Sequence, residues 1–74
     1  MADTHSIDLK LKRLRAIEGD YRSAMKRAED DYERNFISRE KMLKIKKKYE
    51  AKMDKVAPKL RRLQHLRNEM KARG

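Results

Sequence analysis

The chain has 74 residues, of which 46% are charged, 38% hydrophobic and 5% aromatic, and it carries a formal net charge of +10. A chain of this length forms at most one domain and buries only about 60% of the surface that its unfolded form exposes. Two glycines and one proline leave few turn-forming residues, which excludes a sheet with many turns and favours a small number of long helices.

The first predicted element is a helix over residues 7–34. Its apolar residues recur at alternating spacings of three and four, which is the pattern of a coiled-coil seam with a and d positions. The series consists of Ile7, Leu11, Leu14, Tyr21, Met25, Ala28 and Tyr32, with Glu18 as the one polar member. This periodicity argues against disorder, which so charged a composition would otherwise permit.

A turn is predicted at residues 35–38, where the seam pattern breaks. Asn35 suits the left-handed residue that often closes a helix. Ser38 can cap the amides of a following helix, and Glu40 in its first turn favours the positive end of the helix dipole. A connection this short makes the flanking helices antiparallel neighbours.

The second predicted element is a helix over residues 39–72, in which the seam resumes. Its members are Met42, Lys46, Tyr49, Met53, Val56, Leu60, Leu63, Arg67 and Met70. Pro58 falls on the outer face without shifting the pattern, although proline inside a helix costs about 3 kcal/mol. We expect either one helix kinked at Pro58 or two helices broken at Ala57.

Together the elements predict an all-α, antiparallel two-helix coiled-coil hairpin. Folding the chain at about residue 37 pairs positions whose numbers sum to about 74. Four apolar residues lie one position before an a site and widen the stripe beyond what two helices cover, namely Ile17, Ala24, Ile45 and Leu66. They are the candidate protein interface, either for a homodimer forming a four-helix bundle or for another helical protein.

The positive charge is unevenly distributed. Residues 1–37 contain eight Lys and Arg against eight Asp and Glu, whereas residues 38–74 contain fourteen against four. Near the turn, acidic residues of the first helix are expected to neutralise the lysines of the second. At the free end of the hairpin, basic residues of both helices should form a positive tip, consisting of Lys10, Lys12, Arg13, Arg15, Lys59, Arg61, Arg62, Arg67, Lys71 and Arg73.

This charge favours non-catalytic binding of nucleic acid, DNA or RNA, or of a ribonucleoprotein. No base-reading motif accompanies it, so contacts should be mainly to the backbone, with little sequence preference. A protein-interaction adaptor or assembly factor that uses the apolar face is the alternative. A third possibility is that these lysines and arginines form an ordinary solvent-exposed surface without a binding function.

No feature of the sequence indicates an enzyme, a cofactor, a metal or a small-molecule substrate. There is no cysteine, the two histidines, His5 and His65, are expected at the surface, and no serine has a suitable histidine partner. No apolar run approaches the roughly 20 residues that span a bilayer. We therefore expect a soluble, intracellular, cytoplasmic protein.

Overall fold

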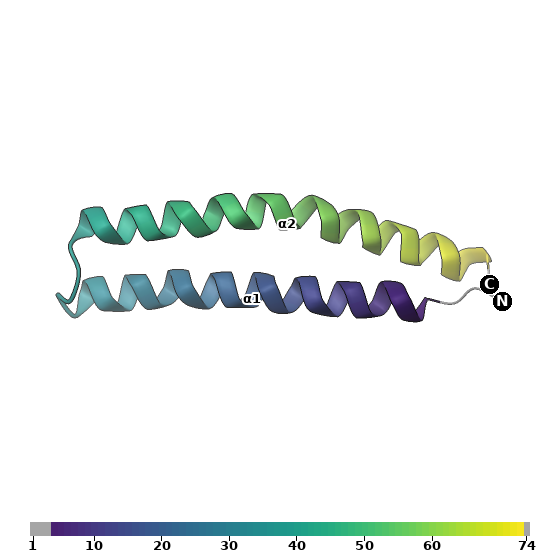
Figure 1. The fold of residues 1–74 in the computed structure, drawn as a ribbon, viewed down its shortest axis with the longest axis horizontal. Helices are drawn as coiled ribbons and strands as arrows, with labels where there is room; N and C mark the ends of the chain where they lie inside the picture. The colour runs from purple at the N-terminus through teal and green to yellow at the C-terminus, as the bar shows by residue number, and fades with distance from the viewer. Residues whose placement is uncertain (1–3, 74) are drawn as a thin grey trace.

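The structure, a computed structural model, describes residues 4–73. It contains two helices, α1 over His5–Glu33 and α2 over Arg39–Arg73, and no strand within these residues. The helices lie side by side and run in opposite directions, so that the start of α1 and the end of α2 meet at one end of a rod (Figure 1). The rod measures 56 × 16 × 13 Å. These features confirm the predicted all-α antiparallel hairpin.

The helix bounds differ slightly from the sequence estimates. Helix α1 begins at His5 rather than at residue 7 and ends one residue earlier than residue 34, while α2 extends to Arg73. Arg34 therefore belongs to the connection, which covers residues 34–38. No helix within residues 4–73 has the length and apolar character needed to cross a membrane.

The end of α1 is closed by a residue in the left-handed conformation. Asn35 has a φ of 64°, as predicted, and its N–H donates to the carbonyl of Tyr32 at 3.0 Å. The N–H of Phe36 donates to the carbonyl of Asp31 at 2.8 Å. This pair of bonds is the Schellman motif, which satisfies carbonyls that the last turn of a helix leaves without partners.

The start of α2 is capped by Ser38, again as predicted. The backbone N–H of Lys41 donates to Ser38 Oγ at 3.1 Å, and the N–H of Met42 donates to the Ser38 carbonyl at 3.0 Å. A side-chain cap of this kind stabilises a helix by about 1 kcal/mol. These two capped helix ends, with a connection of five residues between them, reverse the direction of the chain.

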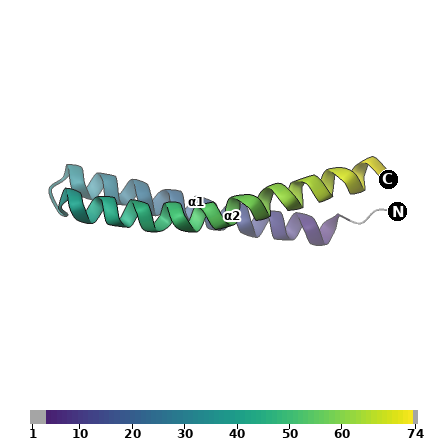
Figure 2. The ribbon, with the colours of Figure 1, turned by 90° about the horizontal axis from the view of Figure 1, so that it is seen from above.

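Helix α2 passes through Pro58 as a single helix, without a break at Ala57. Pro58 is exposed, so the hydrogen bond that it cannot donate is lost on the solvent side rather than in the contact with α1. Figure 2 shows α2 crossing α1 and curving along its second half. Solvent-facing proline is a recognised cause of helix bending.

The core is thin, because two helices can enclose only a narrow seam. Leu11 and Ala28 are 3% exposed and Val56 is 8% exposed, and these are the buried hydrophobic residues among those described. Most other seam residues are half-buried, and Tyr32, although at a seam position, is 37% exposed. Much of the apolar stripe therefore remains open along the sides of the rod.

Candidate nucleic-acid interface

Two charged residues of α2 that interrupt the seam each form an ion pair across to α1. Lys46 Nζ lies 2.6 Å from Glu29 Oε1, and the Arg67 guanidinium donates to the Asp8 carboxylate. The hydrogen bond from Arg67 lowers the pKa of Asp8, and the hydrogen bond to Glu29 raises the pKa of Lys46. Both pairs join residues whose numbers sum to 75, in keeping with the expected register.

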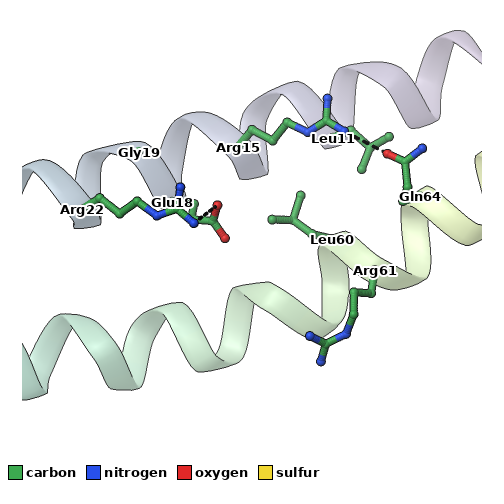
Figure 3. A pocket seen from close by; sticks show the side chains of 8 residues that line it. All are labelled: Leu11, Arg15, Glu18, Gly19, Arg22, Leu60, Arg61 and Gln64. Carbon is green, nitrogen blue, oxygen red and sulfur yellow. Dashed lines mark hydrogen bonds and ion pairs between the residues drawn. The ribbon is translucent and has the colours of Figure 1, made fainter.

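The third charged seam residue, Glu18, is paired within α1, where Arg22 lies 3.1 Å from its carboxylate. Nearby, the Arg15 guanidinium donates across the helices to Gln64 Oε1 at 2.9 Å. Figure 3 shows both interactions in a groove of about 480 Å³, with Leu60 pointing between them and Arg61 directed away from the space between the helices. Arg15 and Arg22 are thus already held by protein partners.

We call this side of the rod the ion-paired face. Its members on α1 alternate in charge along the helix, and every polar seam residue has a partner on this face. It comprises Asp8, Arg15, Glu18, Arg22, Glu29, Lys46, Gln64 and Arg67.

The opposite side, the open face, is apolar and basic. Near the free end it contains a groove of about 510 Å³, called here the basic groove. Its lining consists of Leu14, Ile17 and Leu63 together with Lys10, Arg13, Lys59 and Arg62. Ile17, one of the floor residues, is 39% exposed.

A second groove lies on the open face nearer the turn, with a volume of about 430 Å³. Ala24 and Ile45 of the candidate protein interface line it, together with Asp31. Tyr49 also lines this groove, and the centroid of its ring lies 5.7 Å from that of Tyr21. Lys52 Nζ lies over both rings, 5.7 Å from the centroid of Tyr21 and 5.3 Å from that of Tyr49. Leu66, the fourth predicted interface residue, is 44% exposed.

A row of cations follows the same side of α2, and we call it the basic ladder. Its members are Lys41, Lys48, Lys52, Lys55, Lys59 and Arg62. From residue 48 onward they are spaced by four and three residues, the spacing that places side chains on one helical face. All six are exposed, and none forms an ion pair within residues 4–73. At 1.5 Å per residue the ladder is about 32 Å long.

The ten residues predicted as one basic tip do not share one surface. Lys10, Arg13, Lys59 and Arg62 line the basic groove on the open face. A groove on the ion-paired side instead contains Lys12, Arg15 and Arg67, and Arg61 lines the groove of Figure 3. Lys71 and Arg73 lie in the last turn of α2. The free end is therefore two basic surfaces, and on one of them Arg67 and Arg15 are held by Asp8 and Gln64.

Sequence reasoning missed four members of the ladder, Lys41, Lys48, Lys52 and Lys55. It assumed that the acidic run 29–33 neutralises the lysines near the turn, but the ion pair that crosses the helices there is Lys46 with Glu29. Lys44 pairs instead with Glu40 of its own helix, at 3.6 Å. The spacing of four and three residues among these lysines was the feature of the sequence that could have predicted the row.

No protein-family model, curated protein or solved structure matches the chain. Within residues 4–73, no three His, Asp or Glu side chains are grouped so that they could hold a metal ion. His65 Nε2 lies 3.1 Å from Glu69 one turn along α2, a neighbour that the sequence reading overlooked, and both side chains are exposed.

Proposed function

We propose that the protein binds nucleic acid without catalysis, through contacts between the basic ladder and the phosphate backbone. The observation that supports this proposal is the row of six exposed cations on one side of α2 without any ion pair in the described part of the chain. Lysine and arginine side chains in such a row can each approach a phosphate without first breaking an ion pair.

The geometry of the ladder suits a strand of phosphates. Successive cations between residues 48 and 62 are separated by about 5 Å along the helix axis, since each step is three or four residues at 1.5 Å. A polyanion about 32 Å long can therefore follow α2 and meet a cation at regular intervals. The ion-paired face lacks such a row, because Lys46, Arg22 and Arg67 are held by carboxylates.

Sequence preference should be low. Base stacking needs open aromatic faces, but Tyr21 and Tyr49 pack against each other in the seam, and Lys52 lies over both rings. The ladder contains five lysines and one arginine, and lysine approaches phosphate as a point charge rather than by a fixed two-bond geometry. Backbone contact without base readout is the mode that this composition favours.

Salt dependence tests the proposal directly. If all six ladder cations neutralise phosphates of a duplex, the affinity falls by about 10³-fold between 50 and 200 mM salt, since each contact contributes about 0.9 to the logarithmic slope. Fluorescence anisotropy with labelled duplex DNA and single-stranded RNA measures this slope.

A matched pair of double variants separates the ladder from the total charge. Lys55→Gln with Arg62→Gln removes two ladder cations, and Lys47→Gln with Arg61→Gln removes one lysine and one arginine that lie off the ladder. The first should lower the salt slope by about 2, whereas the second should change it much less. Equal slopes for the two variants, or equal affinity of the wild type for heparin and nucleic acid, would contradict the proposal.

A further inference from the structure

We infer that the basic groove is a docking site for an acidic amphipathic helix of a partner protein, a site that shares two of its cations with the ladder. The groove is defined by an apolar floor of Leu14, Ile17 and Leu63 and by four cations at its edges. The apolar floor indicates that the ligand has an apolar surface, and the basic edges indicate that it carries negative charge.

The apolar floor requires an apolar ligand surface. Phosphate contacts need no such floor, and an aliphatic side chain left 39% exposed, as Ile17 is, gains stability only when another apolar group covers it. A groove between two antiparallel helices is the surface on which a third helix packs, with anchors spaced three, four and seven residues apart. A partner helix bound there would form a three-helix bundle with α1 and α2 in the half of the rod that lies away from the turn.

The charged edges specify acidic flanks. Lys10 and Arg13 on α1 and Lys59 and Arg62 on α2 line the groove without any carboxylate among them. Three other grooves on the hairpin each include a carboxylate, namely Glu18, Asp31 or Asp8. Of these four grooves the basic groove is the one without a carboxylate, and glutamate or aspartate on both flanks of a docked helix would supply the negative charge.

A second copy of the chain is a poor occupant by the same reasoning. Each copy carries a net charge of +10, and a symmetric dimer through this groove would bring Lys10, Arg13, Lys59 and Arg62 against themselves. Like charges placed together at an interface oppose association by several kcal/mol. Charge complementarity thus favours an acidic partner over the homodimer that the width of the apolar stripe suggested.

Two ladder residues, Lys59 and Arg62, also line the groove. A helix seated in the groove would cover part of the row that we assign to phosphates. Partner and nucleic acid should therefore compete, although only the partner depends on the apolar floor.

The test uses a synthetic amphipathic peptide of about 20 residues with leucine at its a and d positions and glutamate on both flanks. Controls are the same peptide with lysine for glutamate, and a peptide of equal charge with its leucines replaced by serine. Titration calorimetry measures binding to the full chain, and light scattering measures the mass of the free protein. Ile17→Asn removes part of the floor, and Leu43→Asn is the matched control, since Leu43 is 49% exposed and lies outside the groove.

We expect the glutamate peptide alone to bind, Ile17→Asn to weaken it about tenfold as loss of an interface anchor does, and Leu43→Asn to leave it within twofold. Ile17→Asn should leave the affinity for duplex DNA unchanged, so the two proposals fail separately. The inference is overturned if the glutamate peptide does not bind, if Ile17→Asn binds it as the wild type does, or if the free protein is a dimer that Ile17→Asn makes monomeric.

Discussion

The two long sides of the hairpin are built from the same sequence repeat but have opposite character. On the ion-paired face, charged seam residues are matched by Asp8, Arg22 and Glu29. On the open face, apolar residues and unpaired cations lie together around two grooves. A two-helix rod has no other element to cover either side, so each side must satisfy its own exposed groups.

The difference arises where the repeat is irregular. Each polar seam residue, Glu18, Lys46 or Arg67, directly follows a large aliphatic residue, which is Ile17, Ile45 or Leu66. One helical step turns the side chain by about 100°. The charged residue therefore points to one side and its apolar neighbour to the other. Because the same pair of residue types recurs at three seam positions, the charged residues lie together on the ion-paired face and the apolar residues lie together on the open face.

The largest expected effect comes from comparing a leucine of each side. Leu11 is 3% exposed and lines grooves of the ion-paired face, whereas Leu66 is 44% exposed. Leu11→Ala should lower the free energy of unfolding by about 2–5 kcal/mol, out of roughly 4–11 kcal/mol expected for a chain of this size. Leu66→Ala should cost less than about 1 kcal/mol. Urea unfolding followed by circular dichroism measures both, and equal losses would show that the open face is covered in solution.

The fold could be predicted from the sequence because its determinants are local. The seam spacing, Asn35 at the left-handed position and Ser38 at the cap are each read within a few residues. With one short turn, a two-helix chain has essentially one antiparallel arrangement. The exposure of Tyr32 was not predictable in this way, since a seam position tells which side a residue faces and not how much of it a thin core covers.

The candidate site was predictable only in part. Counting charges located the basic free end, but it did not assign Arg13 and Arg15 to opposite faces, which depends on the side of the seam that each residue occupies. Nor did it show that Arg67 is held by Asp8 or that the acidic run near the turn leaves Lys48 without an ion pair. Ion-pair choices depend on side-chain reach across the helices, which a residue count does not contain.

A smaller effect is expected from exchanging the charges of the cross-helix pair near the turn. Glu29→Lys places a second cation beside Lys46, and Lys46→Glu places a second carboxylate beside Glu29, so each single change should lower the midpoint of thermal unfolding. The double exchange restores opposite charges at 2.6 Å and should recover most of the loss. Both side chains are partly exposed, so the effects should be smaller than that of Leu11→Ala and should shrink in high salt. Additive losses in the double variant would show that the pair does not form.

The smallest expected effect is the acid sensitivity that Asp8 confers on the ion-paired face. The hydrogen bond from Arg67 lowers the pKa of Asp8 below its ordinary value of 3.8 in the folded chain. Between these two values the unfolded chain binds more protons, so stability rises with pH there. The contribution is fully present above about pH 5 and is lost as the pH falls through the lowered pKa.

Asp8→Asn should therefore flatten the dependence of stability on pH below about pH 4 and leave its shape above pH 5 unchanged. Urea unfolding of both proteins from pH 2.5 to 6 measures this difference. Lys46 has the opposite effect at alkaline pH. Glu29 raises the pKa of Lys46 above 10.5, so the contribution of this pair to stability is lost only as the pH rises beyond that value. If the acid limbs of Asp8→Asn and the wild type coincide, Arg67 is not bound to Asp8 in solution, and it becomes available to phosphate like the cations of the ladder.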